Sequence, residues 1–67
     1  MIITLNNRPE LFDACELSIT EIMQRRNFHF KLLVVKLNGG LIDKKDYAST
    51  LVRDGDELLI IHLVSGG

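Results

Sequence analysis

The chain has 67 residues, of which 46% are hydrophobic and 25% are charged, and its formal net charge is −1. These values are typical of one small soluble domain, which buries only about 60% of the surface of its unfolded chain. Eight Lys and Arg residues are balanced by nine Asp and Glu residues. Because no basic stripe exists, we expect no nucleic-acid partner. No apolar run reaches transmembrane length and Cys15 cannot form an internal disulfide, so we predict a cytoplasmic protein that does not bind membranes.

The first half of the chain predicts two strands and a helix. Residues 1–5 are rich in β-branched side chains, and residues 6–9, which include two Asn and a Pro, are typical of a turn. Residues 10–15 are therefore predicted as a second, antiparallel strand. The helix begins at Ser18, because Ser18 and Glu21 have the spacing of a capping box.

The positions beside the helix start also follow a known pattern. Leu17 and Ile22 have the spacing of a hydrophobic staple, and the helix is expected to end near Asn27. The elements predicted after the helix are, in order, a bridge containing Phe28 and Phe30, a strand over 32–37, a turn over 38–40 and a brief strand at 41–42. A helical turn over 43–47, with Tyr47 packed inward, and a stretch over 49–53 then lead to a tight turn at 54–56.

This order of elements predicts an α+β fold. A helix between strands implies a right-handed crossover that places the helix on one face of a mixed sheet. One helix covers one face, so we expect the other face to meet water or a partner.

The final strand, predicted over 57–64, is apolar on both of its faces. We assign Leu58 and Ile60 to the helix side. An open patch next to the chain end then consists of Leu59, Ile61 and Leu63, continued by Val64, and is a predicted docking surface. The alternative is a strand in mid-sheet that is simply apolar throughout.

A short tail, Ser65-Gly66-Gly67, follows the predicted domain of residues 1–64. Two glycines give the backbone wide conformational freedom and have no side chain to pack. Such a tail is thin enough to enter a narrow channel in another protein. The plainer interpretation is a frayed terminus.

The sequence offers no constellation of catalytic or metal-binding residues. His29 and His62 have no Cys, Asp or Glu at ligand spacing, so we expect no metal site. Cys15 is expected to be a packed thiol, and Asp54 and Asp56 are explained by turn formation. The chain is therefore not expected to be an enzyme.

Several segments, in their order and spacing, resemble the ThiS sulfur carriers of the ubiquitin-like β-grasp superfamily, which also includes MoaD. Two departures are Asp43, where proline is common, and Tyr47, where tryptophan is common; both are structural positions. The matching segments, which span nearly all of the chain, are residues 2–6, 17–22, 38–39, 43–48 and 54–56, and the terminal Gly66-Gly67.

The resemblance implies a function for the tail. An E1-like adenylating enzyme of the ThiF type would use ATP to adenylate the Gly67 carboxylate, and sulfur from a donor protein would convert it to a thiocarboxylate. A thiazole synthase of the ThiG type would accept this sulfur in thiamin biosynthesis. The carrier itself would bind no cofactor, since ATP is used by its partner.

Three alternatives remain open at this point. One is a MoaD-like carrier for molybdopterin synthesis, although MoaD relatives tend to be longer and to contain more helix. Another is a ubiquitin-like modifier whose terminal glycine is joined to lysines of target proteins. The last is an interaction domain in which the two glycines are coincidental.

Overall fold

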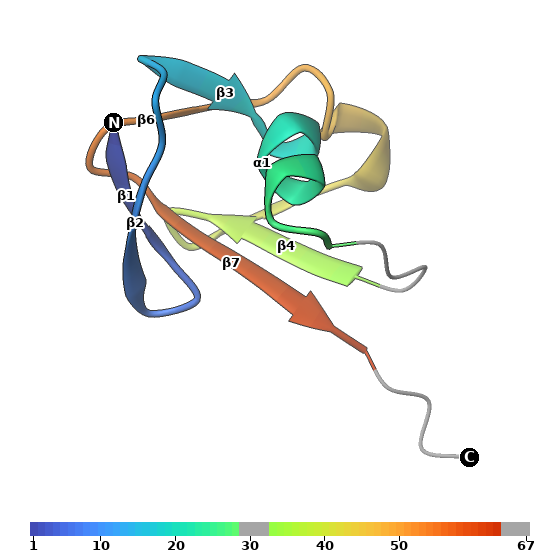
Figure 1. Ribbon diagram of the computed structural model, residues 1–67. Helices are drawn as coiled ribbons and strands as arrows, with labels where there is room; N and C mark the ends of the chain where they lie inside the picture. Colours follow the sequence, from blue (N-terminus) through green and yellow to red (C-terminus); the bar gives the residue numbers. More distant parts are fainter. Residues whose placement is uncertain (29–32, 64–67) are drawn as a thin grey trace.

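The computed structural model describes residues 1–28 and 33–63, which form a five-stranded sheet, a two-stranded sheet and a short α-helix (Figure 1). The elements, in chain order, are β1 (Ile2–Leu5), β2 (Arg8–Leu11), β3 (Glu16–Ser18), α1 (Ile19–Arg25), β4 (Leu33–Leu37), β5 (Gly40–Ile42), the 3₁₀ helix η1 (Lys44–Asp46), β6 (Leu51–Arg53) and β7 (Glu57–His62). Residues 29–32, with His29, Phe30 and the predicted strand start at Leu32, lie outside the described ranges.

The main sheet has five strands in the order β2-β1-β7-β4-β5. β7 lies in its middle, parallel to β1 and antiparallel to β4, while the β1–β2 and β4–β5 pairs are antiparallel hairpins. The prediction of an α+β fold, with a mixed sheet and one main helix on one face, is confirmed by this arrangement (Figure 1).

Both hairpins of the main sheet close through two-residue turns. Asn6 and Asn7 have φ values of 50° and 67°, and Asn38 and Gly39 have φ values of 50° and 84°. Positive φ at both central residues is the signature of a type I′ turn, whose twist suits a hairpin and which favours Asn and Gly. The turn at Asn38-Gly39 agrees with the prediction.

The second strand was predicted in the wrong place. It spans Arg8–Leu11 rather than residues 10–15, because Asn6 and Asn7 alone reverse the chain. Pro9 lies within β2, opposite Thr4, where the predicted turn had placed it outside any strand. A proline is tolerated here because β2 is an edge strand, so the missing N–H removes no bond from the ladder.

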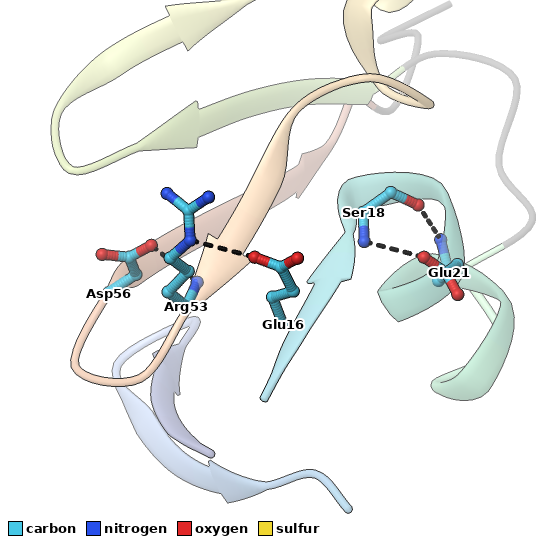
Figure 2. Close-up of polar contacts among 5 residues, drawn as sticks. All are labelled: Glu16, Ser18, Glu21, Arg53 and Asp56. Atoms are coloured by element: carbon cyan, nitrogen blue, oxygen red, sulfur yellow. Dashed lines mark hydrogen bonds and ion pairs between the residues drawn. The ribbon is translucent and has the colours of Figure 1, made fainter. Parts of the chain in front are cut away.

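A second sheet, of two strands, was not predicted. β3 pairs antiparallel with β6, with Leu17 opposite Val52 and Glu16 opposite Arg53. Leu17 and Val52 are buried, and an exposed ion pair joins Arg53 Nε to Glu16 Oε2 at 3.0 Å (Figure 2). Residues 14 and 15, predicted as strand, instead lead into β3.

Helix α1 begins as the sequence predicts. The Ser18 hydroxyl oxygen accepts from the Glu21 backbone N–H at 3.1 Å, and Glu21 Oε1 accepts from the Ser18 backbone N–H at 3.0 Å (Figure 2). These two bonds form the predicted capping box. The helix ends at Arg25, and Asn27, with a φ of 60°, turns the chain away.

The hydrophobic core lies between α1, the inner face of the main sheet and the second sheet. Leu17 and Ile22, the pair with the spacing of a hydrophobic staple, both belong to this core, and Tyr47 packs against it as predicted. The buried apolar residues are Ile3, Leu5, Phe12, Leu17, Ile19, Ile22, Val35, Val52, Leu58 and Ile60.

Candidate functional site

The last strand has a buried face and an open face. Leu58 and Ile60 are buried, at 0% and 3% exposure, against the helix side of the sheet, as the alternation predicts. Leu59 is half-buried and Ile61 is 44% exposed on the opposite face, and Leu63, just beyond the strand, is 47% exposed. Of the predicted docking residues, these three are therefore brought to the uncovered side of the domain or to its end. Val64, Ser65, Gly66 and Gly67 lie outside the described residues.

The backbone of β7 near this end is held by a side chain. β1 ends at Leu5. Beyond it, the side-chain amide of Asn6, rather than the backbone of a further strand residue, makes the hydrogen bonds to β7. Asn6 Oδ1 accepts from the Ile60 N–H at 2.8 Å, and Asn6 Nδ2 donates to the Ile60 carbonyl at 3.1 Å. At the other end of β7, Asn38 Oδ1 accepts from the Glu57 N–H at 2.8 Å. Two turn asparagines thus fix both ends of the strand that leads to the tail.

The open face also contains residues that were not included in the predicted docking surface. Val34 lies opposite Ile61, and Lys36 lies between Leu59 of β7 and Leu41 of β5. Directly opposed residues share a face of the sheet, so these side chains extend the surface formed by Leu59 and Ile61. Alternation within the predicted strand 32–37 already placed Val34 and Lys36 together, but only the strand order shows that they lie beside β7.

The two acidic residues of the last turn serve the fold. Asp54 Oδ1 accepts from the Ile2 N–H at 2.7 Å. Asp56 Oδ2 accepts from the Arg53 N–H at 2.8 Å (Figure 2). Gly55, with a φ of 84°, supplies the positive φ that a type II turn requires. Turn formation therefore accounts for the Asp56 carboxylate, as predicted, whereas the Asp54 carboxylate joins the turn to the start of β1.

Cys15 is exposed, so the prediction of a packed thiol was wrong. The chain around it leads from β2 to β3 over the surface, and it is Phe12 rather than Cys15 that fills the core here. Within residues 1–28 and 33–63, no three His, Cys, Asp or Glu side chains gather as a metal site would require. In the same ranges, no helix is long and apolar enough to cross a membrane.

The fold and this face can now be compared with known proteins. A family model described as the ThiS family matches residues 3–67. A crystal structure of a thiamine biosynthesis protein (ThiS) from Geobacter metallireducens is 29% identical, and the match covers all of both chains with a TM-score of 0.89. A solution structure of a thiamine biosynthesis protein from the same organism is also 29% identical, with a TM-score of 0.80; the match covers all of this chain and 88% of that one. No curated protein sequence matches.

The family match covers the sheet, the helix and the end of the chain, and the structural matches extend over the whole domain. The structural match, with its TM-score of 0.89, agrees with the mixed sheet and main helix described above. The resemblance noted from the sequence is therefore confirmed, and the chain belongs to the ThiS family, with the ubiquitin-like β-grasp fold.

Proposed function

We propose that this chain is a sulfur carrier whose Gly67 carboxylate is converted to a thiocarboxylate and donates sulfur for thiazole formation in thiamin biosynthesis. The observation that carries the proposal is the ThiS family match, which extends to residue 67 and so includes both terminal glycines. The similar solved structures are those of thiamine biosynthesis proteins, which favours the same pathway.

The proposed chemistry has two steps. A carboxylate is a poor electrophile, so a ThiF-type enzyme lets it attack ATP, forming an acyl-adenylate and releasing pyrophosphate. Sulfur from a donor protein, at the oxidation level of sulfide, then attacks the acyl carbon and displaces AMP. One oxygen of Gly67 is thereby replaced by sulfur, and a ThiG-type thiazole synthase accepts it. The proposal places this chemistry in the cytoplasm, where ATP is available.

The carrier's own part is to present the tail and a surface for recognition. The open face and the strand end supply Leu59, Ile61 and Leu63, and Val64 is proposed to continue this surface to the tail. In-line attack requires close positioning, since misplacement by about 1 Å can lower a rate on the order of a hundredfold. A rigid strand end, held by Asn6 at Ile60, supports such positioning. Catalysis and ATP binding belong to the partner.

The test compares three chains: the native protein, a variant lacking Gly67, and a variant with one alanine added after Gly67. Each is incubated with the ThiF-type enzyme, ATP and a sulfur donor, and its intact mass is measured. The native chain is expected to gain the mass of an oxygen-to-sulfur replacement. The other two chains are not expected to gain this mass, because removing or adding one residue moves the carboxylate by about 3 Å. Equal sulfur uptake by all three would refute the mechanism.

A second step separates the pathways. The thiocarboxylate form is offered to a thiazole synthase and to a molybdopterin synthase subunit, and sulfur transfer is measured. Transfer to the thiazole synthase is expected. The short α1, of seven residues, supports this choice, because MoaD relatives tend to contain more helix. Transfer to the molybdopterin enzyme alone, or isopeptide-linked adducts with target lysines, would favour one of the alternatives.

A further inference from the structure

Asn6 continues the ladder between β1 and β7 with its side chain after its backbone has turned away from the sheet. The pairing of these parallel strands reaches Leu5 and Leu58, and the Asn6 N–H donates to the Leu58 carbonyl at 3.0 Å. In a regular parallel ladder, the Asn6 carbonyl would next accept from the Ile60 N–H. Asn6 instead opens a turn, with a φ of 50°, and its side-chain oxygen Oδ1 accepts this bond at 2.8 Å.

The same side chain also binds the other backbone polar group of Ile60. Asn6 Nδ2 donates to the Ile60 carbonyl at 3.1 Å, so one amide holds both the N–H and the C=O of a single β7 residue. We call these two bonds the Asn6 clamp. On its other side, β7 pairs with β4, where Val35 lies opposite Ile60. Ile60 is therefore held from both sides of β7, although β1 itself has ended.

Ile60 is the point from which β7 leads to the tail, seven residues before Gly67. If a partner holds these residues extended, at about 3.3 Å each, they span about 23 Å. Over that length, a rotation of about 3° at Ile60 moves the Gly67 carboxylate by about 1 Å, which can lower a rate on the order of a hundredfold. Support from β4 alone would permit such a rotation, and the Asn6 clamp opposes it.

We propose that Asn6 is a positioning residue for the adenylation of Gly67. This role rests on the proposed function, since it concerns the attack of the Gly67 carboxylate on ATP in the partner enzyme. Asn6 acts through Ile60 rather than on the reacting atoms, by fixing the direction in which β7 leads to the tail. Loss of the clamp should lower kcat, because fewer bound chains present the carboxylate in line, and should leave KM nearly unchanged.

The test measures ATP–pyrophosphate exchange by the ThiF-type enzyme while the carrier concentration is varied, which gives kcat and KM for adenylation without a sulfur donor. Asn6→Gly removes the clamp and suits the positive φ of the turn. Asn7→Gly is a control in the same turn, because no hydrogen bond of the Asn7 side chain is described within residues 1–28 and 33–63. Asn38→Gly is a second control, because it removes a similar bond, to the Glu57 N–H, at the far end of β7.

Asn6→Gly is expected to lower kcat about fivefold or more, with a KM within about twofold of the native value. Asn7→Gly and Asn38→Gly should keep the native kcat, because neither changes the end of β7 next to the tail. Native kcat for Asn6→Gly would overturn the proposal. An equal loss of kcat for Asn6→Gly and Asn38→Gly would do so too, since a weakened strand would then explain both.

Circular dichroism checks that each variant is folded at the assay temperature. If Asn6→Gly does not fold, Asn6→Asp replaces it, because an aspartate keeps an acceptor for the Ile60 N–H but has no N–H to donate to the Ile60 carbonyl. The same loss of kcat is then expected in direction, and native kcat for Asn6→Asp would overturn the proposal.

Hydrogen exchange followed by NMR tests the clamp in the carrier alone. The Ile60 N–H should exchange about tenfold faster or more in Asn6→Gly than in the native chain, because its acceptor is gone. The Ile61 N–H should keep its protection, because backbone groups alternate along a strand and this one points to β4. Native exchange of the Ile60 N–H in Asn6→Gly would overturn the proposal.

The two assays keep this role distinct from the proposed function. Absence of pyrophosphate exchange with the native chain would refute the proposed function and the role of Asn6 in it. Exchange with the native chain and an equal kcat for Asn6→Gly would refute the role of Asn6 alone. Exchange with the expected loss in Asn6→Gly, but no thiocarboxylate when a sulfur donor is added, would refute the sulfur-carrier function and leave the positioning role in place.

Discussion

Replacing Ser18 by alanine is expected to destabilise the domain by removing one half of the capping box. Ser18 is 6% exposed, and its hydroxyl is the side-chain acceptor for the Glu21 N–H in the first turn of α1. The loss of such a cap costs about 1 kcal/mol, and up to about 2 kcal/mol in protein hosts. In a domain of this size, each 1 kcal/mol lowers the melting temperature by about 4–8 °C.

The measurement is thermal and urea unfolding followed by circular dichroism. Ser49→Ala is a matched control, because Ser49 is exposed and its hydroxyl donates one long bond, of 3.3 Å, to the Asp46 carbonyl. The control should change the free energy of unfolding by less than about 0.5 kcal/mol. If Ser18→Ala has the same melting temperature as Ser49→Ala and the native chain, the cap does not stabilise this helix and the prediction is wrong.

The other half of the capping box gives the prediction a pH dependence. The bond from the Ser18 backbone N–H, and then the Ser18 side chain, lower the pKa of the Glu21 carboxyl. A carboxyl whose pKa is lower in the folded state stabilises the fold above its unfolded pKa and loses that effect as the pH falls through the folded pKa. Glu21→Gln keeps an acceptor for the cap but cannot titrate. The stability difference between the native chain and Glu21→Gln should therefore stay constant above the ordinary glutamate pKa of 4.5 and shrink as the pH falls below it, and a difference that does not change at low pH would contradict this.

The remaining predictions concern the docking face, the core and the last turn. Ile61→Glu should leave the fold nearly intact, since Ile61 is 44% exposed, but weaken binding to the adenylating enzyme by about 1 kcal/mol or more; a folded variant with native affinity in calorimetry would exclude Ile61 from the interface. Ile22→Ala should cost about 2–5 kcal/mol in urea unfolding, because the side chain is fully buried, and a loss below 1 kcal/mol would show that the core collapses into the space. Gly55→Ala should cost about 1–2 kcal/mol, because φ is 84° there although an added Cβ meets open space; an unchanged melting temperature would contradict the strain.

Local features of this protein could be predicted from the sequence. The capping box needs Ser18 and Glu21 three residues apart, and both of its bonds form within one turn of the chain. The turn at Gly55 and the alternation that buries Leu58 and Ile60 are equally short-range. Each depends on backbone geometry over a few residues, so neighbouring residue types were sufficient evidence. The family resemblance rests on the order of such local features.

Other features were decided by contacts between distant segments. β3 and β6 are three residues each, and neither has a pattern that would identify it, so their pairing is apparent only once both lie beside the core. β2 was predicted in the wrong place because residue composition does not distinguish a longer turn over residues 6–9 from a two-residue turn at Asn6 and Asn7 followed by Pro9 in an edge strand. Cys15 is exposed because Phe12 occupies the core nearby.

The candidate site divides in the same way. Leu59, Ile61 and Leu63 were identified by alternation along one strand, and the structure places them on the uncovered side or at the strand end. That Lys36 lies between Leu59 and Leu41 follows from the order β7-β4-β5, in which strands distant along the chain become neighbours. Alternation along a strand determines which face a residue occupies, whereas strand order determines its neighbours there. The sequence therefore indicated a docking face, and the tertiary structure alone placed a charge within it.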